Sequence, residues 1–555
     1  MTAAVPAPDL SAPTVLRLRT ETLIVLASVY WVLAFNRTFL GAALGAKPHA
    51  AAGVGLLAAM ALLLAALHVL VLALLSTRHT VKPLIVLLTL VGAAVAHYEL
   101  SYGVVMDPAM VRNVLHTESA EAGELLTWRL ALDLALYAAL PIVLLLPVRI
   151  AVPPWRERWR LRLLLVIAAI ATIGVALAWQ FQPIASLMRN HKEVRYHMTP
   201  LNAVWSTASV LAADARGAAQ PRQAIGLDAA PGPGWAQRDR PRLVVLVVGE
   251  TARAANWGLS GYARQTTPRL ATTPGVVNFS QATACGTSTE VSLPCMFAPV
   301  GRRDYDEARI RGSESLLHVA ARAGVQVRWV DNNTGCKGVC DGLPEERLSA
   351  ATAPGLCAER CFDEGLVRAL EARLDALRSN DRGTQLLVLH MLGNHGPSYF
   401  RRYPPAFERF TPACRDDDLG RCTREEIVNA YDNALLYTDH VLASLIARLA
   451  EASGRVDAAL LYASDHGESL GEKNLYLHGV PWLVAPKEQT DVPMVFWASP
   501  GFERSAGLDA ACLRERAKAA VQHDHLFHSL LALLDVRTSL YDAAFDVTRG
   551  CRAQP

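Results

Sequence analysis

The first 183 residues contain five long apolar runs, at roughly 22–40, 52–76, 81–103, 129–148 and 161–181. Each run is about 20 residues long, which is the length an α-helix needs to cross a ~30 Å hydrocarbon core. Five such runs in succession exceed what the core of a soluble domain can bury. We therefore expect a transmembrane domain of five helices over residues 1–183. Because no cleavage site follows the first run, we expect that helix to stay as an anchor.

Basic residues near the ends of these runs predict the orientation of the helices. They gather in three segments: before the first run (Arg17, Arg19), between the second and third (Arg78, Lys82), and between the fourth and fifth (Arg149, Arg156, Arg158, Arg160, Arg162). Segments rich in Lys and Arg remain on the cytoplasmic side of a membrane. Five crossings then place the chain after residue 183 outside the cytoplasm. The net charge of +3, with scattered basic residues, gives no indication of nucleic-acid binding.

All ten cysteines fall in this external part of the chain. An even number of cysteines in an oxidising compartment predicts disulfides. Close spacing favours four pairs, and elimination leaves a fifth: Cys285–Cys295, Cys336–Cys340, Cys357–Cys361, Cys414–Cys422 and Cys512–Cys551. A zinc site built from the two C-x3-C sequences is the competing interpretation.

Beyond the membrane domain the sequence changes character twice. Residues 184–240 mix charged, aromatic and apolar residues and end in a Pro- and Gly-rich stretch, which predicts membrane-surface helices and a linker. Residues 241–555 alternate apolar strands at 242–249, 384–392 and 457–464 with helical patterns such as 424–452. That alternation predicts an α/β catalytic domain with a mainly parallel central sheet.

Titratable residues follow each of these strands. Glu250 follows the first strand, His390 and His395 lie at and after the end of the second, and Asp465 and His466 follow the third. Ligands of open α/β sheets bind outside the carboxyl ends of the strands. Zinc accepts such nitrogen and oxygen ligands, and a catalytic zinc keeps one position open. Alone, Glu250 is explained as a helix N-terminal carboxylate and Asp465 as an N-cap, but their convergence favours a metal site.

The stretch CGTSTEVSLPC, residues 285–295, places threonines in a loop that a disulfide would close. A threonine hydroxyl is a weak nucleophile until a base or a metal activates it. We expect this loop to hold a threonine against a zinc ion bound by Glu250, Asp465 and His466, with the hydroxyl in the fourth position.

These motifs resemble the lipid A phosphoethanolamine transferases, which include the mobile colistin resistance enzymes and belong to the alkaline-phosphatase-like superfamily. The resemblance covers nearly the whole chain. It includes the five apolar runs and the stretches RNHKEVRY, VVGETARAANWGLSGYARQTTPRL, CGTSTEVSLPCMF, DNNTGCKGVCD, HMLGNHGPSYFRRYP and SDHGESLGEKNLYLHGVP.

The resemblance implies an enzyme of the Gram-negative inner membrane with its catalytic domain in the periplasm. Such an enzyme would move phosphoethanolamine from phosphatidylethanolamine to a phosphate of lipid A through a phosphothreonine, and so confer resistance to polymyxin and colistin. It implies Thr289 as nucleophile and zinc ligand. It also implies roles near the substrate phosphate, or at a second zinc ion, for His395 and His478, and further pocket positions for His390 and Lys337.

The loop 106–126 resembles a family segment that contributes to lipid binding, with Asn113 and Glu118 as its candidate residues; an ordinary surface loop is the alternative. Glu290, directly after Thr289, is expected to point away from the metal. The partners implied are the donor lipid, the acceptor lipid A and the bilayer, with the enzyme a monomer.

Other interpretations remain open. One is a phosphoethanolamine transferase that acts on core heptose or a surface polysaccharide. Another is a glycerol phosphate transferase of the lipoteichoic acid synthase type, although the dense disulfides fit the first group better. A sulfatase is disfavoured because the sequence has no C-x-P-x-R stretch. A membrane sensor with a degenerate enzyme fold is disfavoured because the nucleophile and all ligands are present.

Overall fold

The computed structural model describes residues 16–45, 50–218, 221–358, 360–377 and 383–552. The chain divides into two compact units. The first unit is Met1–Leu100 with Trp128–Ser206, and the second is Ser101–Thr127 with Thr207–Pro555. The second unit therefore includes a segment that lies, in sequence, between two apolar helices of the first. The domain limits expected from the sequence, 1–183, 184–240 and 241–555, remain a prediction.

The first unit is helical. Its helices are α1 (Thr20–Phe35), α2 (Arg37–Gly45), α3 (Ala50–Leu75), α4 (Val81–Tyr102), α7 (Trp128–Leu134), the π-helix η1 (Ala135–Ala139), α8 (Leu140–Leu145) and α9 (Trp155–Asn190). Among the described residues, four apolar stretches are long enough to cross a membrane: Gly53–Leu75, Val81–Tyr102, Trp128–Leu145 and Trp155–Asn190. The sequence predicted five.

The expected span that is missing from these four is the first apolar run, residues 22–40, which is divided between α1 and α2. Helix α1 has 16 residues, or about 24 Å at 1.5 Å per residue, which is short of the hydrocarbon thickness. The break lies at Asn36, whose buried side-chain amide donates to the carbonyls of Trp31 (2.9 Å) and Thr199 (2.8 Å). Its carbonyl oxygen accepts from the Thr199 amide (3.0 Å). The sequence did not reveal this interruption, because one polar residue barely changes the composition of an apolar run.

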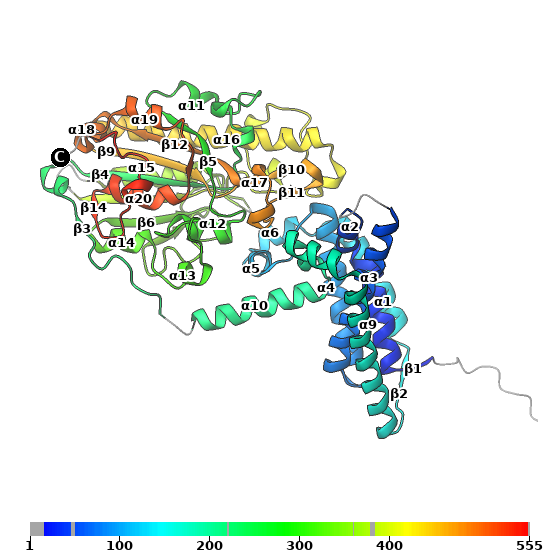
Figure 1. The fold of residues 1–555 in the computed structure, drawn as a ribbon. Helices are drawn as coiled ribbons and strands as arrows, with labels where there is room; N and C mark the ends of the chain where they lie inside the picture. Colours follow the sequence, from blue (N-terminus) through cyan, green and yellow to red (C-terminus); the bar gives the residue numbers. More distant parts are fainter. Residues whose placement is uncertain (1–15, 46–49, 219–220, 359, 378–382, 553–555) are drawn as a thin grey trace, which may run out of the picture. The chain divides into compact units, whose positions relative to one another are not determined.

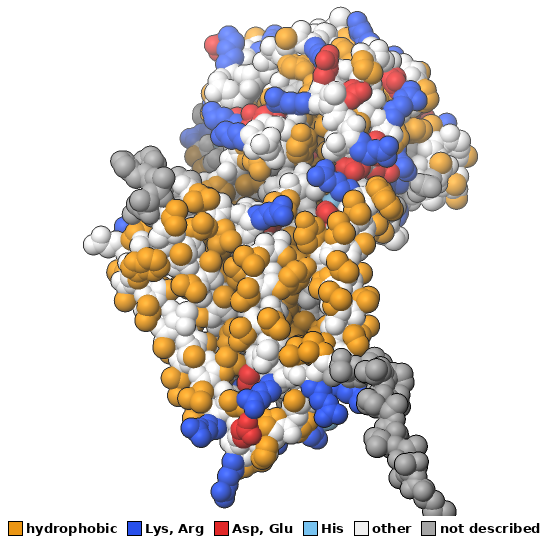
Figure 2. All heavy atoms as spheres, turned by 90° about the vertical axis from the view of Figure 1, so that its right-hand side faces the viewer, with side chains coloured by type: hydrophobic (Ala, Val, Ile, Leu, Met, Phe, Trp, Pro, Cys, Tyr) orange, Lys and Arg blue, Asp and Glu red, His pale blue; other side chains and the backbone are white. Residues whose placement is uncertain are grey.

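The three basic segments lie at the same end of the first unit. Arg19 pairs with Glu157 (3.0 Å), Lys82 donates to the carbonyl of Leu146 (2.9 Å), and Arg162 donates to the carbonyl of Ala73 (2.8 Å). Figure 2 shows hydrophobic side chains over the surface of these helices and Lys and Arg side chains gathered at their end. The short parallel strands β1 (Arg17–Arg19) and β2 (Arg149–Ala151) pair at this end as well. The grouping expected from the sequence is thus present.

The second unit is built on an eight-stranded sheet with the order β13-β5-β12-β9-β4-β8-β6-β7. Its strands are β4 (Arg242–Gly249), β5 (Val277–Thr283), β6 (Gln326–Asp331), β7 (Glu345–Arg347), β8 (Thr384–His390), β9 (Asp457–Ser464), β12 (Asp491–Ala498) and β13 (Val521–Gln522). The run from β9 to β7 is parallel, but β12 is antiparallel to both β9 and β5. The sheet is therefore mixed.

Helices cover the two faces of this sheet (Figure 1). On one face α12 (Thr289–Met296), α14 (Leu316–Arg322) and α20 (Asp524–Leu534) share a core with alternate residues of β4, namely Val244, Leu246 and Val248. On the other face α16 (Arg424–Glu451) packs against β9 and against α15 (Glu364–Ala376). Every residue of β4, β8 and β9 is buried, as expected for strands covered on both faces.

Shorter elements complete the second unit. They are α5 (Pro108–Leu115), α6 (Ser119–Glu124), α11 (Pro268–Thr272), α13 (Glu307–Arg311), α17 (Lys487–Thr490), α18 (Pro500–Ala506), α19 (Ala510–Arg516) and the pairs β10 (Ser469–Leu470) with β11 (Tyr476–Leu477) and β3 (Ala230–Pro231) with β14 (Val536–Arg537). Helix α10 (Leu201–Ala218) begins in the first unit and ends in the second.

Five disulfides tie loops of the second unit. They join Cys285 to Cys295, Cys336 to Cys340, Cys357 to Cys361, Cys414 to Cys422, and Cys512 to Cys551. These are the five pairs that spacing and elimination favoured, and no cysteine is left free. The two C-x3-C sequences form separate disulfides instead of a shared zinc site.

We expect the native protein to contain no free thiol, because each cysteine has a partner within one short loop or terminal region. Alkylation of the denatured, unreduced protein should label none of the ten cysteines, and reduction before alkylation should label all of them. Mass spectrometry of the peptides counts both. Substantial labelling without reduction would contradict the pairing.

Candidate active site

Three adjacent strands deliver the titratable residues to one edge of the sheet. Strand β4 lies between β8 and β9, with Val248 opposite His390 and Gly249 opposite Ser464. The residues that follow these positions therefore emerge side by side, which is the convergence predicted from the sequence. Glu250, His390, Asp465 and His466 are all fully buried there.

Glu250, Asp465 and His466 form a group that fits a metal ion, with one ligand atom from each within 4.8 Å of the others. His466 Nε2 lies 3.3 Å from Glu250 Oε1 and 3.5 Å from Asp465 Oδ2. The other imidazole nitrogen, Nδ1, lies 2.9 Å from the carbonyl of Gly467, which directs Nε2 into the group. Within the described part of the chain, Glu250 Oε1 and Asp465 Oδ2 have no hydrogen-bond partner. Two buried, unpartnered carboxylate oxygens facing each other favour a bound cation.

The ionisation of these residues agrees with that conclusion. Burial raises the pKa of Asp465 to about 7, and the charge of Glu250 acts in the same direction. Burial lowers the pKa of His466, but the carboxylates of Asp465 and Glu250 outweigh it and raise this pKa to about 10. In the absence of an ion, protons compensate the two carboxylates. A divalent cation bound by the same atoms would displace them.

Thr289 lies directly against this group. It is the first residue of α12 and sits in the loop closed by the Cys285–Cys295 disulfide. Its hydroxyl donates to Glu250 Oε2 at 3.0 Å and lies 3.4 Å from His466 Nε2. The start of a helix also favours negative charge, because its first amide groups point outward. A hydroxyl in this position suits nucleophilic attack on a phosphorus atom.

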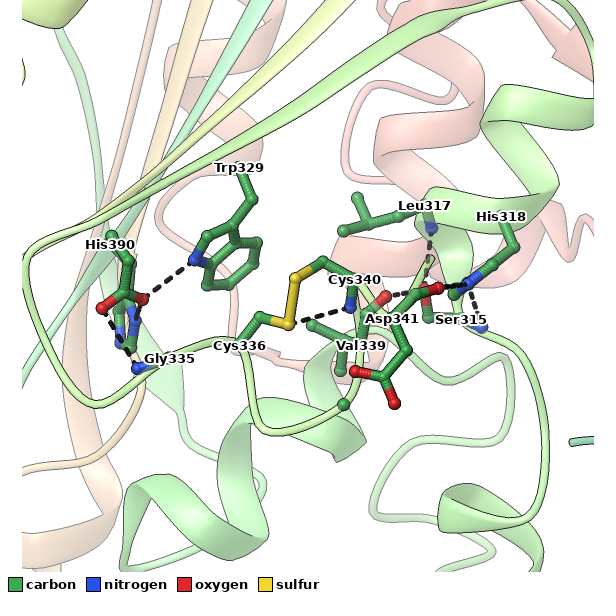
Figure 3. Close-up of a disulfide and its surroundings, with 12 residues drawn as sticks. Ser315, Leu317, His318, Trp329, Gly335, Cys336, Val339, Cys340, Asp341 and His390 are labelled. Carbon is green, nitrogen blue, oxygen red and sulfur yellow. Dashed lines mark hydrogen bonds and ion pairs between the residues drawn. A yellow bond between two sulfur atoms is a disulfide. The ribbon is translucent and has the colours of Figure 1, made fainter. Parts of the chain in front are cut away.

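A layer of polar residues orients Glu250 and His390. Asn333, in the loop after β6, donates to Glu250 Oε2 at 2.6 Å and lies 3.3 Å from His390 Nε2. His390 Nδ1 is 2.9 Å from Asp331 Oδ2, which also accepts from the Trp329 indole at 2.9 Å (Figure 3). His390 therefore reaches the metal group through Asn333. The sequence analysis did not identify Asn333, although it follows the end of a buried strand as the other site residues do.

Lys337 belongs, by sequence, to the loop that the Cys336–Cys340 disulfide closes. Figure 3 shows that disulfide and its surroundings. Its backbone is left-handed, with φ of +48°, a conformation uncommon for residues with a side chain. The loop is anchored where the Ser315 hydroxyl donates to the carbonyl of Val339 at 2.6 Å. The Lys337 ammonium lies 3.3 Å from Glu290 Oε2, with only 7% of its side chain exposed.

Glu290 is buried and faces cations, not the metal group. His116 Nδ1 lies 3.0 Å and Arg311 Nη2 3.2 Å from its Oε1 atom. Burial acts to raise the pKa of Glu290, but the charges of Arg311 and Lys337 outweigh it and lower that pKa below its ordinary value. The carboxylate next to the nucleophile is therefore an anion enclosed by positive charge.

Two histidines complete the pocket, each paired with a carboxylate. His395 Nε2 lies 3.2 Å from Glu121 Oε1, and His478 Nδ1 lies 2.9 Å from Glu468 Oε2. The two rings are 5.5 Å apart, and the ring of His478 is 4.4 Å from that of His466. His466, Glu468 and His478 form a second group that fits a metal ion, and His395 is not a member of it.

Glu121 lies in the loop 106–126, for which Asn113 and Glu118 were the residues predicted from the sequence. Three carboxylates at intervals of three residues each pair with the rest of the second unit: Glu118 with Arg347, Glu121 with His395 and Glu124 with Arg402. Glu121 is thus the one that contacts a predicted site residue. Asn113 is half-buried in α5, where its carbonyl accepts from the Thr117 hydroxyl at 2.7 Å. The roles of Asn113 and Glu118 stay predictions.

Comparison with known proteins gives matches over both units. Residues 64–215 match the family described as phosphoethanolamine transferase EptA/EptB, and residues 242–536 match the family described as sulfatase. Phosphoethanolamine transferase EptA of Salmonella typhimurium is 39% identical over 469 residues, which cover 83% of this chain and 84% of that protein. Phosphatidylethanolamine transferase Mcr-1 of Escherichia coli is 37% identical over 470 residues, covering 83% and 85%.

A solved structure resembles the chain over nearly its whole length. The integral membrane protein lipooligosaccharide phosphoethanolamine transferase A of Neisseria meningitidis has a TM-score of 0.91 and 35% sequence identity. The match covers 97% of this chain and 100% of that one.

The pair of Glu121 and His395 predicts a pH-dependent stability difference. Burial acts to lower the pKa of His395, but the charge of Glu121 is the stronger effect and raises that pKa to about 9. Burial acts to raise the pKa of Glu121, but the charge of His395 is the stronger effect and lowers that pKa to about 2. The contribution of His395 to the free energy of unfolding is fully present below the pKa of an unfolded histidine, about 6.5, and is lost as the pH rises through 9. Glu121→Gln should therefore lower the melting temperature by several degrees near pH 6, and by much less above pH 9.

Thermal unfolding of the detergent-solubilised, chelator-treated protein measures this difference. Glu118→Gln is the matched control, because it removes a carboxylate from the same segment that does not contact His395. A melting-temperature difference between wild type and Glu121→Gln that stays constant from pH 6 to pH 9.5 would argue against the ion pair.

Proposed function

This chain belongs to the phosphoethanolamine transferase family, and from that premise we propose that it transfers phosphoethanolamine from phosphatidylethanolamine to a phosphate of lipid A. The observation that carries the proposal is the Thr289 hydroxyl, held 3.0 Å from Glu250 at the edge of a metal-binding group. The names of its relatives, which include a lipooligosaccharide phosphoethanolamine transferase, support both the group transferred and the class of acceptor. The absence of a C-x-P-x-R stretch supports transferase over sulfatase chemistry.

The ligand set supports zinc as the metal. Two carboxylates and one imidazole are common zinc ligands, and three protein ligands leave a position open for chemistry. Bound there, zinc would lower the pKa of the Thr289 hydroxyl and polarise a phosphoryl oxygen of the substrate. The second group, with His466, Glu468 and His478, is the place where a second ion would bind.

In the first half-reaction the Thr289 oxygen attacks the phosphorus of phosphatidylethanolamine. Its proton moves toward Glu250 Oε2, which already accepts its hydrogen bond. The bond between phosphorus and the glycerol oxygen breaks, and diacylglycerol leaves. His395, whose pKa of about 9 keeps it protonated at neutral pH, can supply the proton that the leaving oxygen needs.

In the second half-reaction a phosphate oxygen of lipid A attacks the same phosphorus. The Thr289 oxygen leaves and recovers its proton from Glu250, and His395 takes up a proton from the attacking phosphate hydroxyl or from solvent, so the enzyme returns to its starting state. The Lys337 ammonium pairs with Glu290, the residue after Thr289, and we infer that it supplies positive charge to the phosphoryl oxygens in both steps. Because water would also cleave the phosphothreonine, the burial of Thr289, which is 6% exposed, favours transfer over hydrolysis.

The cellular setting follows from both units. We assign the first unit to the Gram-negative inner membrane as a multi-pass anchor with its basic end in the cytoplasm. The segment 22–40, in which α1 and α2 follow each other across the break at Asn36, supplies the fifth crossing of this proposal. The second unit, with its five disulfides, then lies in the periplasm. The enzyme acts as a monomer. An added ethanolamine ammonium reduces the negative charge of lipid A, so cationic polymyxin and colistin bind it more weakly.

We expect Thr289→Ala to abolish the modification of lipid A, because the variant lacks the attacking oxygen, whereas Thr289→Ser should retain part of it. Mass spectrometry of lipid A from a Gram-negative host that produces each variant measures the added phosphoethanolamine. If no variant modifies lipid A while purified wild type still releases diacylglycerol, the acceptor is a different surface glycan. Equal modification by wild type and Thr289→Ala would refute the assigned nucleophile.

The zinc content of variants distinguishes the proposed metal ligands from the proposed nucleophile. Thr289→Ala should keep most of the zinc, because three ligands remain, whereas Asp465→Asn should fall from about one ion per chain to a small fraction of that. Elemental analysis of purified, dialysed protein measures the ratio. Equal zinc in wild type and Asp465→Asn would exclude Asp465 as a ligand.

A further inference from the structure

Glu290 has no part in the reaction described above, although it follows the nucleophile directly. Only 2% of its side chain is exposed, and its carboxylate lies outside both metal-binding groups. Burial of a carboxylate is costly unless cations and hydrogen bonds compensate it. A buried acid next to a nucleophile that must approach an anionic phosphate therefore calls for an explanation.

Two cations and a histidine surround this carboxylate, each from a different segment of the second unit. Lys337 comes from the disulfide loop after β6, Arg311 from the end of α13, and His116 from the residue after α5. Arg311 also donates to the backbone carbonyl of Glu290, which fixes the start of α12. Glu290 thus links two loops and a helix to the residue that carries the chemistry.

Of the side chains around Glu290, that of Lys337 has the fewest other contacts to fix its position. A lysine side chain has four rotatable bonds, so an unrestrained ammonium would occupy many positions. The Cys336–Cys340 disulfide and the Ser315 hydrogen bond hold the backbone of its loop (Figure 3), but they do not hold the ammonium. Within the described residues, Glu290 is the carboxylate that pairs with it.

We propose that Glu290 is a positioning residue that holds the Lys337 ammonium beside the phosphoryl site at Thr289. This inference rests on the proposed function. Electrostatic stabilisation of a transition state requires charges that are in place before the reaction, and Glu290 keeps this charge in place.

The central experiment compares purified wild type with Glu290→Gln, which keeps the shape of the side chain and removes its charge. We expect kcat for diacylglycerol release to fall about 10-fold or more, with little change in KM, because a phosphoryl-stabilising charge acts mainly in the transition state. Glu307→Gln is the matched control. It removes a carboxylate that pairs with Arg311 but not with Lys337, so its kcat should stay near that of wild type.

A double-mutant cycle distinguishes positioning from general structural support. If Glu290 acts through Lys337, Glu290→Gln should have no further effect on kcat in a Lys337→Met background. If it acts independently, the two losses multiply, and this result would overturn the proposal. Glu290→Asp serves if the Gln variant does not fold. It keeps the buried negative charge, but its carboxylate is one methylene farther from Lys337, so kcat should again fall.

A readout that does not depend on activity separates this inference from the proposed function. Acetylation of Lys337 by an amine-reactive ester, followed by peptide mass spectrometry, reports whether its ammonium is held; exposed Lys518 is the internal reference. The rate for Lys337 relative to Lys518 should rise several-fold in Glu290→Gln and not in Glu307→Gln. If wild type releases no diacylglycerol, the proposed function fails. The acetylation rate of Lys337 still tests the contact between Lys337 and Glu290 in that case. An unchanged rate in Glu290→Gln means that Glu290 does not hold Lys337.

Discussion

The carboxylates of Glu250 and Asp465 repel each other inside the protein, and the architecture of the second unit keeps them together nonetheless. Each follows a fully buried strand, and β4 and β9 are neighbours in register, so neither side chain can move away without disrupting the sheet. Their unpartnered oxygens and His466 Nε2 converge on one point. The free energy of such an arrangement is favourable when a cation occupies it, because uncompensated buried charges cost several kcal/mol. Under the proposed function, folding thus prepares a site whose stability and chemistry depend on the same ion.

The surroundings of Thr289 follow a second electrostatic rule. In the proposed reaction the substrate is an anionic phosphate diester, so the residues that receive it would need to present positive charge without closing the metal position. A carboxylate holds each of three cations near Thr289, namely Lys337, Arg311 and His395. These carboxylates fix the positions of the cations and remove only part of the positive potential. Lys337 also lies in a loop that the Cys336–Cys340 disulfide closes. The pocket is consequently prepared for an anion before any substrate arrives.

Much of this site could be predicted from the sequence, because strand ends in a parallel sheet converge by geometry. The three strands at 242–249, 384–392 and 457–464 are present nearly as expected, with the second ending at His390, and they bring Glu250, Asp465 and His466 together. Contacts between segments distant in sequence were not accessible in this way. Glu121 was not among the predicted residues, because one loop sequence does not reveal which of three evenly spaced acids meets a histidine 274 residues away. Similarly, hydropathy did not reveal the break at Asn36, and strand composition did not reveal that β12 runs antiparallel.

The second unit is discontinuous in sequence, since Ser101–Thr127 belongs to it while both flanking helices belong to the first unit. Synthesis therefore delivers the residues His116 and Glu121 well before the sheet that they contact exists. Their partners, Glu290 and His395, follow after at least 150 further residues. The contacts of this segment with the α/β unit can form only after the residues from 290 to 395 have been synthesised. A fragment that starts after the membrane helices would still form the metal-binding group, but it would lack one wall of its own pocket.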